Sequence, residues 1–144
     1  SSTSEKSITT EVTGEMLFSG PNSLQAPVSV SVDGLAEELN LEPSDLKRIG
    51  ISSIRVTLDG EQAELSESLL LQIVSNNTEM EALGTLSPLG EGNSFDLNVA
   101  EEVNLLPFLK DDGATWVLDV NLSEDIMDEM KATAELSLTI KHKN

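Results

Sequence analysis

The sequence predicts an all-β protein: a single β-sandwich, of jelly-roll or immunoglobulin-like type, with about seven or eight strands and two or three short helical inserts. The main observation is that apolar residues occupy every second position in several short runs, most clearly at residues 28–32, 95–99 and 134–140. Successive side chains of a strand point to opposite faces, so each run has one apolar and one polar face. Such strands bury their apolar faces only by stacking two sheets or by closing a barrel.

The N-terminal part of the chain contains two predicted strands. Residues 8–18 alternate loosely between apolar and polar side chains, and turn-forming residues at 20–23 end this strand. The second strand covers residues 28–33 and follows a proline. The small, polar residues 1–7 are expected to be a flexible N-terminal tether, attached to a single β-sandwich domain over residues 8–144.

Helical spacing interrupts the strands between residues 34 and 50. Leucine and isoleucine recur there at helical intervals, Pro43 suits a first helical position, and Gly50 suits the residue past a helix end. We therefore expect roughly one or two short helical turns before the next strand, at residues 54–58. Asp59-Gly60 then predicts a tight hairpin turn.

The middle of the chain supplies two more predicted strands. Residues 69–74 alternate too little for a half-exposed strand, so we expect them in mid-sheet, covered on both faces. Asn76-Asn77 forms a turn, and a weak strand follows at residues 81–86. The sparse apolar content of this weak strand is typical of a sheet edge.

The C-terminal part alternates strands with short helical inserts. Strands are expected at residues 95–99, 116–122 and 133–141, with helical spacing at residues 103–109 and a helical turn at residues 123–130. Acidic residues occupy the first turn of that last insert, where the helix dipole favours them.

The inward-facing residues of these runs form the predicted core. Leu, Val and Ile dominate it, because the chain has one Trp, three Phe and no Tyr. The residues assigned to this core are Val30, Val32, Ile54, Val56, Leu71, Ile73, Leu97, Val99, Trp116, Leu118, Val120, Leu136, Leu138 and Ile140.

The chain is strongly acidic. Its 26 Asp and Glu residues outnumber 8 Lys and Arg residues, which gives a formal net charge of −18 over 144 residues. A surface of this sign repels phosphate, and the sequence shows no Lys or Arg stripe, so we expect neither nucleic-acid binding nor docking on an anionic membrane. Because the acids are spread along the chain, we interpret them as a solubility device, with a basic or cationic partner as the alternative.

No apolar run approaches the roughly 20 residues that a membrane-spanning helix needs. The sequence contains no cysteine, so disulfides, thiolate metal sites and a thiol nucleophile are excluded within it.

No catalytic constellation is recognisable, so we predict a protein that is not an enzyme and has no catalytic, cofactor-binding or metal-binding residues and no cofactor. His142 is the only histidine, and its place in the C-terminal tail predicts a solvated side chain, which cannot serve as a positioned base. Adjacent acids such as Glu37-Glu38 and Asp128-Glu129 diverge in space. Trp116 lies on a predicted core face and therefore offers no platform for a sugar.

Calcium binding is the strongest remaining ligand hypothesis. Asp111-Asp112-Gly113 and the spacing of Asn121, Ser123 and Asp125 supply many oxygen ligands. The second group has Ile126 where a calcium loop of the EF-hand type needs glycine. We interpret the two groups as an acidic turn and a capped helix start.

A strand, a short helical segment with the pattern Leu-x-x-Phe-Leu-Lys or similar, a glycine turn and a further strand follow one another in the C-terminal half. These segments are residues 95–100, 106–110, 111–113 and 116–121, and a helix at 44–49 leads into a strand at 51–58 in the first half. The arrangement resembles small envelope lipoproteins of unknown function that are common in Bacteroidota-type bacteria. Over most of the chain, this resemblance implies an exported β-sandwich tethered by a lipidated cysteine just before Ser1, and it implies no active site.

The sequence therefore favours a non-enzymatic, exported or cell-envelope domain that acts through protein–protein contacts, as an accessory subunit or adhesive module. The alternative is a calcium- or carbohydrate-binding β-sandwich module, and a hydrolase is disfavoured by the residue inventory. We expect an unidentified protein partner to contact an exposed sheet edge, at residues 8–15 or 81–86, or a helical insert. Self-assembly through such an edge is a further hypothesis. Met127 and Met130 are a candidate soft docking surface, although packing over the core is favoured for them.

Overall fold

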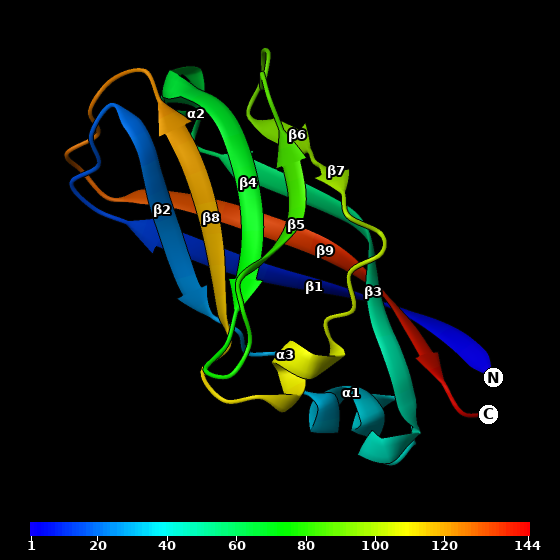
Figure 1. Ribbon diagram of the computed structural model, residues 1–144. Helices are drawn as coiled ribbons and strands as arrows, with labels where there is room; N and C mark the ends of the chain where they lie inside the picture. Colours follow the sequence, from blue (N-terminus) through cyan, green and yellow to red (C-terminus); the bar gives the residue numbers. More distant parts are fainter.

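A strongly curved antiparallel sheet makes up most of the molecule (Figure 1), for which a computed structural model describes residues 1–144. Its strands are β1 (Ser2–Gly14), β2 (Gly20–Pro27), β3 (Leu46–Leu58), β4 (Ser66–Val74), β5 (Glu81–Leu86), β6 (Ser94–Asp96), β7 (Asn98–Val99), β8 (Thr115–Leu122) and β9 (Met130–His142). The helical elements are α1 (Val32–Glu38), the 3-10 turn η1 (Pro43–Asp45), α2 (Gly60–Leu65) and α3 (Leu106–Lys110).

The sheet folds over into two facing layers. Its strand order is β6-β3-β9-β1-β2-β8-β4-β5-β7, and it bends between β1 and β2. Figure 1 shows β2, β8, β4 and β5 as one layer, with β1, β9 and β3 crossing behind them as the other. The predicted all-β sandwich with short helical inserts is thereby confirmed.

Alternation of side chains places the core between the layers. In β9, every second residue from Met130 to His142 is buried. Three of them, Leu136, Leu138 and Ile140, pair with buried isoleucines of β3. All of the predicted core residues are buried except Val30 and Val99, which are half-buried and pack against the same cluster. Period-2 patterning therefore chose residues that nearly all belong to the core, but the core of 35 buried residues also contains many others, such as Leu24, Ile49 and Leu105.

The two layers are joined along one side by a short crossing segment. β6 pairs with β3, and two residues later β7 pairs with β5. Between them the Leu97 amide donates to the Ile54 carbonyl at 2.9 Å, and the Ala100 amide then donates to the Leu83 carbonyl at 2.8 Å. This continuous path from one layer to the other gives the sandwich a nearly barrel-like closure on this side.

Helices cover one end of the sandwich, at the bottom of Figure 1. The Ser31 hydroxyl caps α1 by accepting a hydrogen bond from the Gly34 amide at 3.0 Å. Glu38 at the other end of α1 forms an ion pair with Lys6 of β1 at 3.0 Å. The expected helical turns within residues 34–50 and 103–109 are confirmed as α1 with η1 and as α3, although Gly50 lies in β3 rather than after a helix.

The N-terminal segment is not a flexible tether. Residues from Ser2 to Ser7 belong to β1 and pair in register with β9, from His142 back to Ser137. A polar composition gave no sign of this strand, because ladder hydrogen bonds come from the backbone and need no apolar side chains. The expected end of the strand at residue 18 is also wrong, since β1 ends at Gly14.

The cleanest alternating run in the sequence, at residues 28–33, is not a strand. β2 ends at Pro27, where its partner β8 begins at Thr115, and a last hydrogen bond joins the Val28 amide to the Ala114 carbonyl. Beyond that point the segment forms no ladder with β8 or with β1. The alternating valines pack on the core without a ladder, and Val32 starts α1.

Four further expectations were wrong in detail. Asp59 caps α2 through the Glu61 amide instead of forming a hairpin turn, and residues 123–129 form an irregular loop with a β-bridge at Ile126 rather than a helical turn. The predicted strand at 95–99 is split into β6 and β7, as the crossing between layers requires. β4 does lie in mid-sheet, but its outer face is only half-buried, at Leu70 and Gln72.

Candidate functional site

His142 is a buried residue, not the solvated tail residue that the sequence suggested. It belongs to β9, and its ring nitrogens lie 2.8 Å from the Ser4 hydroxyl and 2.8 Å from the Lys143 carbonyl oxygen. Pairing of β9 with both β1 and β3 holds this end of the chain in place. Neither Ser4 nor His142 lines one of the five main surface cavities.

The acidic calcium candidates are occupied by hydrogen bonds within the chain. The Asp111 carboxylate accepts bonds from the Ser75 hydroxyl at 2.7 Å and from both amides of Asn77. These bonds to the charged form hold the pKa of Asp111 well below its usual range. Asp125 accepts from the Ser19 amide at 2.8 Å. No group of three or more His, Cys, Asp or Glu side chains is arranged to hold a metal ion.

The side of the sandwich opposite the β6–β7 crossing is open along β1. β1 pairs with β9 over its full length, but its only pair with β2 is Thr13 with Gln25. Between residues 2 and 11, no backbone group of β1 has a hydrogen-bond partner outside the β9 ladder. β1 therefore presents a free strand edge about ten residues long, which we call the open edge.

A cleft follows the open edge into the sandwich. It is lined by residues 6–10 of β1 on one side, by Ser29 and Val30 on the other, and by Trp116, which is 1% exposed, at its base. The cleft exists because the chain after β2 leaves the sheet without pairing with β1. Of the two predicted edges, the one at residues 8–15 therefore overlaps β1 up to Gly14, and β1 is open on one side as far as residue 11. β5, at residues 81–86, is covered by β7 only at Gly84 and Thr85.

A second exposed feature lies at the far end of β1, in the two loops β1–β2 and β8–β9. Leu17 and Ile126 form an isolated antiparallel bridge, with reciprocal backbone hydrogen bonds of 2.8 and 2.9 Å. Both of their side chains are buried, so the residues beside them face outward. Met16, Phe18 and Met127 are 63%, 59% and 52% exposed, and we call these three residues the apolar tip.

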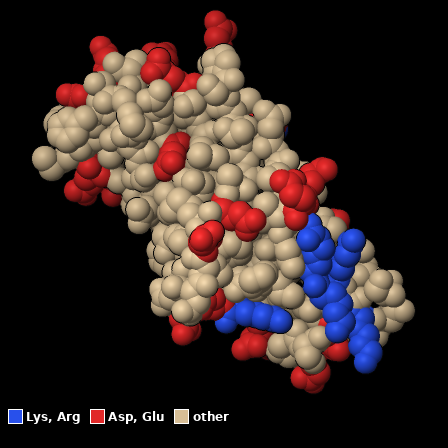
Figure 2. Space-filling model, in the orientation of Figure 1, with Lys and Arg blue, Asp and Glu red and all other residues tan.

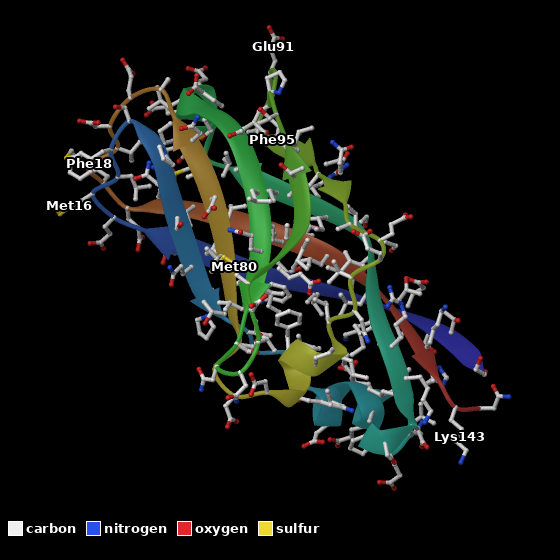
Figure 3. All side chains as sticks on the ribbon, in the orientation of Figure 1. Met16, Phe18, Met80, Glu91, Phe95 and Lys143 are labelled. Atoms are coloured by element: carbon white, nitrogen blue, oxygen red, sulfur yellow. The ribbon has the colours of Figure 1, made fainter.

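Figure 3 shows Met16 and Phe18 projecting from the loop end of the molecule. Sequence reasoning paired Met127 with Met130 and missed the other two tip residues. The structure separates that pair, since Met130 is buried and Met127 is exposed. A usable signal was the run of three successive apolar residues at 16–18, directly before the turn-forming residues 20–23.

Basic side chains gather at the opposite end of the molecule, which corrects the expectation that no basic stripe exists. Figure 2 shows them over the ends of β3 and β9. A β-bulge opposite Lys141 leaves Lys47 exposed and Arg48 half-exposed, between buried Leu46 and Ile49. The bulge thus places two consecutive basic residues on the outer face of the sheet.

Comparisons with known proteins do not assign the chain to a family. No protein-family model matches the sequence, and no curated protein matches it. A chain from Desmodium yellow mottle tymovirus is similar in structure, with 8% identity, coverage of 99% of this chain and 89% of that chain, and a TM-score of 0.37. A chain from Triatoma virus has 11% identity, coverage of 97% and 66%, and a TM-score of 0.41. Yersinia pseudotuberculosis-derived mitogen has 7% identity, coverage of 92% and 84%, and a TM-score of 0.35. Likenesses with such low TM-scores and identities carry no inference about function.

No helix of the structure is long and apolar enough to cross a membrane.

Proposed function

We propose that the chain is a non-enzymatic domain that works through protein contacts, and that its open edge accepts an extended strand of a partner protein. One observation supports this most strongly: β1 shares a single residue pair with β2 and has no other partner on that side. Added strands gain main-chain hydrogen bonds from such an edge, and pockets beside it select their side chains.

The cleft beside the open edge indicates what kind of strand would fit. The inward side of β1 carries half-buried Ile8, and the opposite wall carries half-buried Val30, with Trp116 below them. On the outward side, Ser7 and Thr9 are exposed. An incoming strand with apolar residues at alternate positions would cover the apolar floor and leave its polar face in water.

An exported or cell-envelope location remains part of this proposal. The ends of the chain lie together, because Ser2 pairs with His142 (Figure 1). A tether at the N-terminus would hold this end at a surface and point the loop end away from it. Since β1 spans 13 residues, the loop end would stand about 40 Å from the tether.

Site-specific photo-crosslinking in the cells that make the protein tests the proposed contact. A photoreactive residue in place of Ser7 lies on the open edge, whereas the same residue in place of Ser137, its direct partner on β9, lies one strand further in. We expect a protein adduct from position 7 and none from position 137. Equal adducts at the two positions, or none at position 7, would contradict strand addition at this edge.

A further inference from the structure

We propose that the apolar tip, formed by Met16, Phe18 and Met127, is a second docking surface that binds a cationic, amphipathic segment of another protein. Monomeric proteins expose single large apolar side chains routinely, but adjacent ones mark contact sites. Of the four large hydrophobic residues that are strongly exposed in this chain, three belong to the tip.

The backbone brings the segments that carry these three side chains together. Leu17 is bridged to Ile126, so Met16 and Phe18 flank one side of the bridge and Met127 follows directly on the other side. The bridge therefore holds two exposed apolar segments next to each other at the loop end. Methionine side chains adapt to varied partners, which suits a docking surface.

The tip is held in shape by hydrogen bonds. The Phe18 amide donates to the Asn22 side chain at 3.1 Å, and the Asn22 side chain donates back to the Phe18 carbonyl at 2.6 Å. The Ser19 amide donates to Asp125 at 2.8 Å, which fastens the β1–β2 loop to the β8–β9 loop. A surface ordered in this way loses little conformational freedom when it binds a partner.

The charge around the tip selects the partner. Five exposed acidic residues lie in the same two loops: Glu15, Glu124, Asp125, Asp128 and Glu129. The one nearby base in sequence, Lys131, forms an ion pair with Glu129 at 3.5 Å. Figure 2 shows acidic side chains around the loop end and no basic ones on that part of the visible face. An apolar centre with an acidic rim is complementary to a partner that presents apolar side chains among lysines or arginines.

Acidic charge alone would attract any cation, so the test must distinguish binding by the apolar side chains of the tip from binding by charge. Isothermal titration calorimetry would measure binding of a synthetic helical peptide of leucine and lysine, with a lysine and serine peptide of equal charge as the second probe. The triple variant Met16→Ser, Phe18→Ser and Met127→Ser removes the apolar surface without changing the net charge. Met80→Ser is the matched control, because Met80 is 48% exposed and lies away from the tip (Figure 3).

We expect the triple variant to bind the leucine and lysine peptide at least about tenfold more weakly than the wild-type chain, and Met80→Ser to bind it equally well. The lysine and serine peptide should bind all three proteins weakly and alike. Equal affinity of the wild type and the triple variant for the leucine peptide would overturn the proposal. Because the tip and the open edge share no residue, failure of one proposal leaves the other standing.

Discussion

The carboxylate of Asp111 accepts two hydrogen bonds from Asn77, one from its backbone amide at 2.6 Å and one from its side-chain amide at 2.7 Å. Ser75 adds a third bond at 2.7 Å. The loop that follows β4 is thereby fastened to the loop that precedes β8. Asp111, one of the calcium candidates of the sequence, thus has a structural role, because its carboxylate oxygens accept hydrogen bonds within the chain.

Replacing Asp111 by Asn should lower the melting temperature at neutral pH, because an amide accepts fewer of these hydrogen bonds. The pKa of Asp111 is lowered in the folded chain, so its contribution is complete above the pKa of the unfolded chain, about 3.9, and is lost progressively as pH falls from there toward the much lower pKa of the folded chain. Thermal unfolding from pH 7 to pH 3 should therefore show the difference between wild type and variant beginning to narrow below about pH 4.

Asp112→Asn is the matched control for that experiment, since Asp112 is the adjacent, exposed acid and its side chain makes no hydrogen bond within the chain. It changes the net charge equally and should leave the melting temperature nearly unaltered. The same loss in both variants, or a loss at Asp111 that persists unchanged to pH 3, would show that the hydrogen bonds are not the cause.

A side chain at Gly84 should destabilise the fold, because this residue lies where β5, β7 and β3 meet. A Cβ atom there would be 2.8 Å from Ile54 Cδ1 and 3.2 Å from the Asn98 carbonyl oxygen. Gly84→Ala is expected to cost about 1–3 kcal/mol of unfolding free energy, measured by urea denaturation. Gly60→Ala, at a position with no atom within 4 Å, should change it by less than about 0.5 kcal/mol. Equal stability of the two variants would show that the strands around Gly84 can shift to make room for a methyl group.

Amide hydrogen exchange should reveal the open edge directly. Between residues 3 and 11 of β1, alternate amides point away from β9 and have no partner, so they should exchange rapidly while their neighbours are protected. In β9, which is paired on both sides, the amides should be protected without alternation. Uniform protection along β1 in the purified chain would mean that its edge is covered.

The alternating pattern predicted the fold class and a set of residues that nearly all lie in the core, because burial of one face is a local property of each strand. It did not predict pairing, which depends on partners far away in sequence. The run 28–32 has the best pattern in the chain and no partner, whereas Ser2–Gly14 has a poor pattern and a full-length partner in β9. A strand requires both a suitable sequence and an available ladder.

The candidate sites were predictable only in kind. Sequence reasoning expected an edge rather than a pocket, and one expected edge, at residues 8–15, overlaps the open edge of β1. The sequence could not show which side of β1 is unpaired, because this depends on the pairing of β2 with β8, which takes β2 away from β1. The apolar tip could not be predicted for a similar reason, since the bridge between Leu17 and Ile126 joins two loops that are distant in sequence.

Self-assembly through the open edge makes a separate prediction about salt. Each copy carries a formal charge of −18, and salt screens repulsion between copies beyond about 8 Å at physiological ionic strength. Pairing of two open edges should therefore strengthen from low to high NaCl, as measured by light scattering. A partner held by its basic charge should dissociate over the same range.

Ser7→Lys should weaken this self-association, because a charged lysine on an exposed edge strand disfavours pairing with another strand. Ser137→Lys is the matched control: it adds the same charge on the residue paired with Ser7, but in a strand whose two edges are already occupied. We expect the first variant to remain monomeric at salt concentrations where the second still associates. A wild-type chain that stays monomeric at every protein and salt concentration would exclude self-assembly and leave an unlike protein as the partner of the open edge.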